Sequence, residues 1–145
     1  MKELILASKT DLQAALSYIK DRDIYVTEDI RLIRNSGGYP AIGIKDGATG
    51  FATLSSDQDE ESLSITFAVY VQLFKPEAGV MGDGNKKGVL DVATDVIATL
   101  RNNDLGGLVE SALPSSQGGS EILGNDNLAI LMVPVTMQYT RFDTL

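Results

Sequence analysis

The amino-acid sequence predicts an α+β domain, with an antiparallel or mixed β-sheet, an N-terminal helix and a second helix packed on one face of the sheet. Three observations support this prediction. Apolar side chains recur at helical spacing in residues 8–20 and 88–103, and they alternate with the two-residue period of a strand in residues 62–74. The last apolar run, residues 127–142, also alternates in its second half. Because 145 residues with 43% hydrophobic content are enough for one packed core, we expect a single domain spanning residues 1–145.

The composition excludes several kinds of chemistry. The chain contains no His and no Cys, so a Ser-His-Asp triad, a cysteine nucleophile and a zinc site built from Cys or His are excluded. The formal net charge of −8 argues against a general binder of the nucleic-acid backbone, which needs a basic face. The sequence shows neither an export signal nor an apolar run of the roughly 18 residues that a membrane span requires. We therefore expect a soluble protein, made in a cytoplasm and not associated with a membrane.

The first forty residues predict one helix followed by irregular chain. Residues 8–20 open with Ser8 or Thr10 as helix caps, and their apolar stripe predicts a short amphipathic helix. Residues 24–34 leave a strand or an extended arm open as alternatives. The sequence NSGGYP at 35–40 then predicts a break in regular structure.

Residues 41–74 predict three strands. A brief strand at 41–45, the turn-like sequence KDGATG and a returning strand at 51–55 predict a short hairpin. Residues 62–74 predict a strand about 44 Å long, which exceeds the common length. One face of this strand is apolar throughout. The other face begins with Ser and Thr but becomes apolar at Ala68, Tyr70 and Phe74, so we expect its C-terminal half to be covered.

The rest of the chain predicts a helix and a closing strand. Residues 88–103 carry an apolar stripe opposite acidic side chains, and they predict the second helix. Residues 108–113 are a candidate strand, and the polar residues 114–127 predict a long connection or an arm. The final strand, 127–142, contains Pro134, which cannot donate a ladder hydrogen bond and therefore predicts an edge strand or a bulge.

The sequence GVMGDGNKKGV at 79–89 lies between the long strand and the second helix, as a nucleotide-binding loop would. The phosphate-binding pattern needs a lysine directly after Gly84, but Asn85 stands there, Lys86 comes one residue late, and no Ser or Thr follows to hold magnesium. The glycines also miss the spacing of the dinucleotide pattern. We therefore predict a connecting loop with solvated lysines, and neither a nucleotide nor another cofactor.

The sequence SDQDEES at 56–62 gathers four acidic residues, Asp57, Asp59, Glu60 and Glu61. Their spacing matches only the first half of a calcium loop, since Ser62 replaces the turn glycine and Ala68 stands where the closing Glu belongs. We predict a charged loop between two strands and no metal site, although cation binding at 57–61 stays open. An exposed loop also lacks the apolar pocket that would separate two carboxylate pKa values for acid–base catalysis.

Six residues are candidates for a subunit or partner interface. Aromatic and Met side chains are enriched at interfaces, and lysines beside a helix start would attract an acidic partner. The candidates are Tyr70, Phe74, Lys75, Met81, Lys86 and Lys87. The alternative for Tyr70 is a place in the core, and for the lysines it is simple solvation.

The order of the predicted elements resembles the tail terminator proteins of long-tailed bacteriophages, which are also called tail completion or head–tail joining proteins. The resemblance is carried by an N-terminal helix, short strands around YPAIGIKDG, the long strand ITFAVYVQLF, the helix GVLDVATDVIATL and the final strand VPVTMQYTRF. It is a likeness of pattern and length over most of the chain, without a short invariant motif.

The resemblance implies a structural virion protein that has no enzymatic activity and no cofactor. Such a protein forms a ring, expected to be a hexamer, at the head-proximal end of the tail tube. Its partners are further copies of itself, the tail tube protein and the head connector or stopper protein, while genomic DNA passes only as cargo. The expected location is the phage tail and neck, after assembly in the host cytoplasm.

Two alternatives remain at this stage. One is another ring component of the neck or tail, either a tube subunit or a head-side stopper, which would share the strand-rich plan. The other is a small ligand-binding or enzymatic α+β domain, whose site would be the segments GVMGDGNKKGV and DQDEE.

Overall fold

The computed structural model describes residues 1–34, 37–55, 58–74, 76–125 and 128–144, and within them a mixed β-sheet of six strands carries three α-helices. The elements are α1 (Lys2–Ala15), the 3₁₀ turn η1 (Asp21–Asp23), β1 (Ile24–Val26), β2 (Ala41–Ser55), β3 (Gln58–Gln72), α2 (Pro76–Met81), α3 (Val89–Leu100), β4 (Ser111–Gln117), β5 (Glu121–Asn125) and β6 (Leu128–Thr144). The predicted fold class is confirmed.

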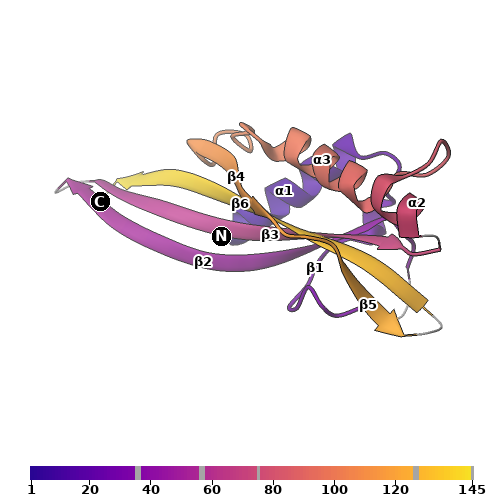
Figure 1. Cartoon of the computed structure of the whole chain (residues 1–145). Coiled ribbons are helices and arrows are strands. Elements are labelled where there is room, and N and C mark those ends of the chain that lie inside the picture. The colour runs from indigo at the N-terminus through magenta and orange to yellow at the C-terminus, as the bar shows by residue number, and fades with distance from the viewer. Residues whose placement is uncertain (35–36, 56–57, 75, 126–127, 145) are drawn as a thin grey trace.

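Strands β3 and β6 form the centre of the sheet. They pair antiparallel over fifteen residue pairs, from Gln58 opposite Thr144 to Gln72 opposite Ile130. The strand order is β1-β2-β3-β6-β4, with β5 also paired to β6, and β1–β2 is the parallel pair among the described strands. Figure 1 shows the long strands extending well past the helices at one end of the molecule.

The main core lies between the sheet and helices α1 and α3, which pack side by side on one face (Figure 1). The predicted alternation of the long strand is confirmed, because Leu63, Ile65, Phe67 and Val69 are at most 1% exposed. The stripe of α3 faces these side chains. Its buried members are Val89, Val92, Ala93, Val96 and Leu100.

The opposite face of the sheet is covered over only part of its length. Ala68 and Tyr70 are buried there in a second cluster with side chains of β5 and β6. This cluster is covered by residues 27–34 and 37–40, which we call the covering segment. Its side chains Ile30, Ile33 and Tyr39 pack on the cluster. The predicted cover is therefore confirmed for Ala68 and Tyr70, where this chain itself supplies it, but not for Phe74, which is 69% exposed.

The N-terminal helix covers Lys2–Ala15 rather than residues 8–20. The apolar stripe continues toward the N-terminus through Leu4 and Ile5, which are buried against the sheet, whereas the chain turns after Leu16. The sequence prediction also missed α2, which lies inside the expected loop. Of the ambiguous residues 24–34, only Ile24–Val26 form a strand, β1, and the rest is irregular chain with a turn in which the Leu32 N–H donates to the Asp29 carbonyl at 3.1 Å.

The predicted short hairpin at 41–55 is wrong, because β2 runs unbroken through KDGATG. The turn-type residues Gly47 and Ala48 together oppose Ser64, so they form a β-bulge within the β2–β3 ladder. A Cβ on Gly47 would lie 2.7 Å from the Ser64 carbonyl oxygen, which explains the glycine at this close approach.

Two predictions for the C-terminal part are also wrong. Residues 114–117 and 121–125 are not a polar connection, since they belong to β4 and β5, and the last two residues of the predicted connection lie outside the described residues. Pro134 is not on an edge, because β6 lies between β3 and the pair β4 and β5. The Pro134 carbonyl accepts a hydrogen bond from the Gly118 N–H at 2.9 Å. The proline nitrogen lies on the same side of β6 and therefore faces the gap between the end of β4 and the start of β5. No ladder hydrogen bond is lost there.

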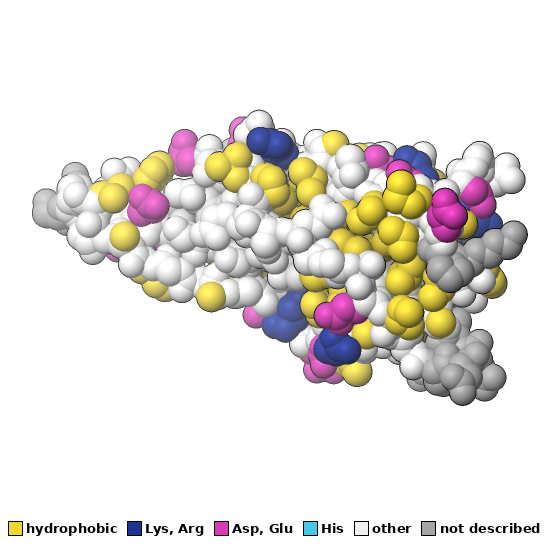
Figure 2. All heavy atoms as spheres, viewed as in Figure 1, with side chains coloured by type: hydrophobic (Ala, Val, Ile, Leu, Met, Phe, Trp, Pro, Cys, Tyr) yellow, Lys and Arg dark blue, Asp and Glu magenta, His cyan; other side chains and the backbone are white. Residues whose placement is uncertain are grey.

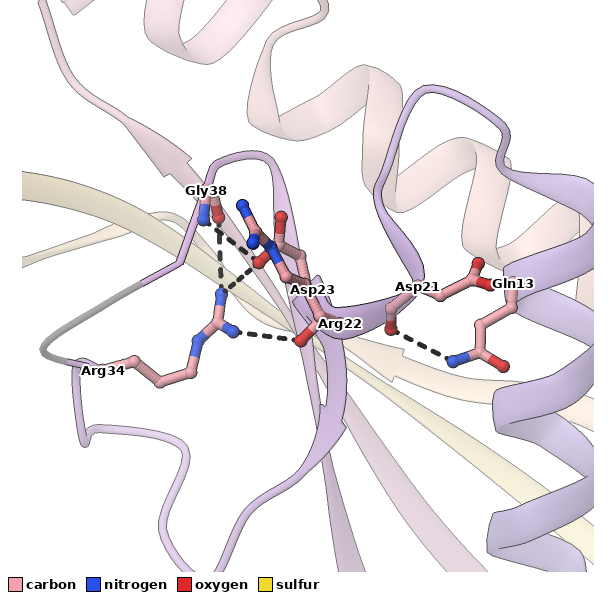
Figure 3. Close-up of polar contacts among 6 residues, drawn as sticks. All are labelled: Gln13, Asp21, Arg22, Asp23, Arg34 and Gly38. Carbon is pink, nitrogen blue, oxygen red and sulfur yellow. Dashed lines mark hydrogen bonds and ion pairs between the residues drawn. The ribbon is translucent and has the colours of Figure 1, made fainter.

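A buried ion pair holds the covering segment in place (Figure 3). Asp23, which is 2% exposed, accepts hydrogen bonds through Oδ1 from Arg34 Nη2 at 3.1 Å and from the Gly38 N–H at 3.0 Å. Arg34 Nη1 also donates to the Arg22 carbonyl at 3.1 Å, and its guanidinium lies 4.1 Å from the centre of the Tyr25 ring. The contact therefore ties Arg34 and Gly38 of the covering segment to the turn η1 that precedes it.

We predict that Asp23→Ala lowers the free energy of unfolding by about 3 kcal/mol, because it leaves a mostly buried guanidinium without its carboxylate. The matched control is Asp21→Ala, an exposed carboxylate in the same turn, for which we expect a change within about 0.5 kcal/mol. Urea unfolding of both variants measures the difference. Equal stabilities would show that the ion pair does not hold the segment.

Candidate functional site

A groove with a volume of about 680 Å³ lies where β3 ends, beside α2 and the loop 82–88. Its walls come from four places in the sequence: the turn after α1, the end of the covering segment, the end of β3, and the chain from α2 to α3. The lining residues are Tyr18, Tyr39, Pro40, Val71, Gln72, Phe74, Ala78, Gly79, Asp83, Asn85, Lys86 and Lys87.

The loop beside the groove is closed by its own carboxylates. Asp83 Oδ1 accepts hydrogen bonds from the Asn85 and Lys86 N–H groups, each at 2.8 Å. Asp91 Oδ2 accepts from the Gly88 N–H at 3.0 Å, at the start of α3. In a phosphate-binding loop such N–H groups point at the ligand. Here two acidic side chains occupy them, so the loop is unsuited to a phosphate.

Both lysines of the loop lie over aromatic rings. Lys86 Nζ is 4.9 Å from the centre of the Phe74 ring, and Lys87 Nζ is 4.8 Å from that of Tyr18. Lys87 also pairs with Asp95 at 2.7 Å, and the Tyr18 hydroxyl donates to Asp95 Oδ2 at 2.6 Å. These contacts hold one wall of the groove in place. Among the described residues, no carboxylate forms an ion pair with the Lys86 ammonium.

The groove contains no group poised for acid–base chemistry among its described residues. Burial and the hydrogen bond to Asp95 raise the pKa of Tyr18, so its hydroxyl stays protonated and cannot serve as a base. Burial opposes ionisation of Asp95, but the hydrogen bonds from Lys87 and Tyr18 prevail and lower its pKa, so it is a poor proton donor. The arrangement is that of a binding surface with apolar walls, the Lys86 ammonium and the Asp83 carboxylate.

The structure separates the six predicted interface residues. Phe74 and Met81 are 69% and 64% exposed, and Phe74 and Lys86 line the groove together. Lys87 also lines it but is engaged with Asp95. Tyr70 is 2% exposed and belongs to the second cluster, so its core alternative holds. Lys75 lies outside the described residues.

Sequence reasoning missed Tyr18 and Tyr39 as groove residues. Tyr18 follows the helix α1 in a turn, and Tyr39 ends the covering segment. Neither has a spacing relation to Phe74 or Lys86, so only the tertiary structure reveals that they share a site.

A second surface lies at the opposite end of the sheet. We call it the distal arm, residues 49–55, 58–62 and 140–144 of β2, β3 and β6. It exposes large apolar side chains: Phe51 is 72%, Leu54 51% and Phe142 43% exposed. From residue 45 onward the outer edge of β2 has no strand partner among the described residues, because β1 pairs only with 42–44.

The predicted acidic loop is part of this arm rather than a loop. Asp59, Glu60 and Glu61 belong to β3, while Asp57 lies outside the described residues. Glu61 accepts from Arg141 Nε at 2.8 Å, and Arg141 Nη1 binds Glu3 at 2.7 Å, which ties the arm to α1. The described residues contain no cluster of three or more potential metal ligands. Strand alternation places neighbouring carboxylates on opposite faces, which explains why these acidic groups do not converge.

No protein-family model matches the chain, and no curated protein matches it at a significant level. In the part of the chain that the structure describes, no helix is long and apolar enough to cross a membrane.

We predict that Gly88→Ala destabilises the protein by about 2 kcal/mol, because a Cβ there would lie 2.3 Å from the Gly82 nitrogen and 2.5 Å from the Val80 carbonyl oxygen. Gly84→Ala is the matched control in the same loop, since a Cβ at Gly84 has no neighbour within 4 Å. Thermal unfolding compares the two variants. If Gly88→Ala is as stable as Gly84→Ala, the loop does not require the close packing described.

We also predict that ATP and GTP at millimolar concentration leave the melting temperature unchanged, because Asp83 and Asp91 occupy the N–H groups that would bind phosphate. Differential scanning fluorimetry with and without magnesium measures this. A shift that disappears in the Lys86→Ala, Lys87→Ala double variant would contradict the prediction.

Proposed function

We propose that the protein is a structural subunit of a ring, expected to be six-fold, that caps the tail tube of a long-tailed bacteriophage and joins it to the head connector. The observation that carries the proposal is the distal arm. An isolated subunit leaves three large apolar side chains and the unpaired edge of β2 in solvent there, and such surfaces are normally covered by another chain.

The two ends of the molecule favour a closed ring. One end presents strands, and the other presents the groove, α2 and the loop 82–88 (Figure 1). A contact between two unlike surfaces is heterologous, and it closes into a ring when the rotation between copies permits. Closing the ring would occupy both ends of every subunit, so neither end would stay free to add a further ring, and this favours a cap over a tube subunit.

The uncovered part of the sheet suits a channel for DNA. On this face, Ser62, Ser64 and Thr66 of β3 lie opposite residues 140, 138 and 136 of β6. Thr66 hydrogen-bonds Thr136 at 3.2 Å, and Ser64 Oγ donates to Gln138 Oε1 at 3.3 Å. These side chains are polar and uncharged. Lys45 of β2 lies opposite Thr66 on the same face, but it pairs with Asp46 at 2.6 Å, so its charge is compensated and attracts the phosphate backbone less.

The groove supports a second candidate, a small ligand-binding domain, because its volume falls within the range of ligand pockets, roughly 300–1,000 Å³. A thermal-shift screen with small molecules and divalent cations distinguishes the two. A ligand that stabilises the wild-type protein, but not a Phe74→Ala variant, would favour this candidate.

We predict that the purified protein forms closed single rings and does not extend into tubes, because ring closure would occupy both ends of each subunit. Native mass spectrometry gives the number of copies, for which we expect six. In an assembling phage, loss of the protein should give tails of irregular, excessive length that fail to join heads. Long tubes formed by the protein alone, or normal tail length without it, would contradict the terminator assignment and favour a tube or stopper subunit.

A further inference from the structure

We infer that the distal arm of one subunit docks in the groove of a second copy of this chain. The inference rests on the proposed ring and specifies how its subunits contact one another.

The arm has the chemistry of a ligand for the groove. Its exposed side chains Phe51 and Leu54 of β2 and Phe142 of β6 are apolar, and β3 between these strands carries Asp59 and Glu60. Arg141 neutralises Glu61, but Glu60 has no ion-pair partner among the described residues. The arm therefore combines apolar side chains with uncompensated negative charge.

The groove complements both properties. Figure 2 shows hydrophobic side chains gathered at the end of the molecule that is opposite the arm. Phe74, which lines the groove, is 69% exposed. Asp83 also lines the groove, but the Lys86 ammonium forms no ion pair with a carboxylate among the described residues. In a protein with a net charge of −8, copies repel one another unless opposite charges meet locally. An ion pair between the acidic arm and Lys86 would provide this local attraction.

The geometry requires the contact to be intermolecular. Strand β3 runs from the arm at Gln58 to the groove at Gln72. At about 3.4 Å per residue the two sites are roughly 45–50 Å apart, and the strand between them is held in the sheet. An arm cannot reach its own groove, so occupation of the groove by an arm links subunits head to tail.

The absence of cysteine makes a disulfide test direct. Leu54→Cys marks the arm and Phe74→Cys marks the groove, which Phe74 lines; both residues are exposed and outside the core clusters. Under mild oxidation the double variant should give a ladder of covalent oligomers that ends at the ring size. An equimolar mixture of the two single variants should give mainly the mixed dimer, whereas each single variant alone should give little product.

Charge exchange provides the specificity control. Lys86→Glu should lower the cross-linking yield of the double variant by about tenfold, because it faces the acidic arm with a like charge. Adding Glu60→Lys should restore most of the yield. Lys9→Glu, on α1 and outside both surfaces, changes the net charge equally and should have little effect.

Each other outcome contradicts a defined part of the account. Rings seen by native mass spectrometry, but with cross-links no more abundant in the double variant than in the single variants, would overturn the arm-to-groove contact and leave the ring intact. A groove that instead takes a segment of another tail protein would give this same result. A protein that is monomeric at every concentration, without cross-links, would contradict both the contact and the proposed ring.

Discussion

The rest of the structure depends on the antiparallel ladder between β3 and β6. Fifteen consecutive residue pairs hold these strands together, and the ladder is longer than the helices can cover. Its core half is stabilised by burial of one apolar face against α1 and α3. Its distal half lies beyond them, so the same pairing that builds the core also projects an arm into solvent.

The second face of the sheet is covered by the covering segment rather than by helices. There the ion pair between Asp23 and Arg34 holds the covering segment over Ala68 and Tyr70, and the segment ends at Tyr39 in the wall of the groove. The groove is thus a consequence of where this cover stops and where the loop 82–88 begins. Its cation, Lys86, and the uncompensated carboxylate of Glu60 lie at opposite ends of β3, which is the arrangement that links subunits in the proposed ring.

The sequence allowed the central elements to be predicted because each carries its own periodicity. The alternation from Leu63 to Val71 and the stripe of α3 require no knowledge of their partners. The length of β2 was not predictable in this way. Asp46, Gly47 and Gly50 are turn-forming residues, and only the pairing of β2 with β3 turns them into a bulge within a strand.

The candidate site could be predicted only in part. Phe74, Met81 and Lys86 follow one another closely in the sequence, and their exposure could be argued from the less polar end of a long strand. The partner groups Tyr18 and Tyr39 come from distant segments, and the engagement of Lys87 by Asp95 depends on how the loop meets α3. Of the two alternatives for Tyr70, the core holds, because the covering segment, which carries only a weak sequence pattern, buries it.

Electron microscopy of the purified protein tests the central claim most directly, since the account requires assembly through unlike ends. The account predicts closed rings of six subunits, with each arm reaching the groove of its neighbour. Particles with two-fold symmetry, open filaments or isolated subunits would contradict it.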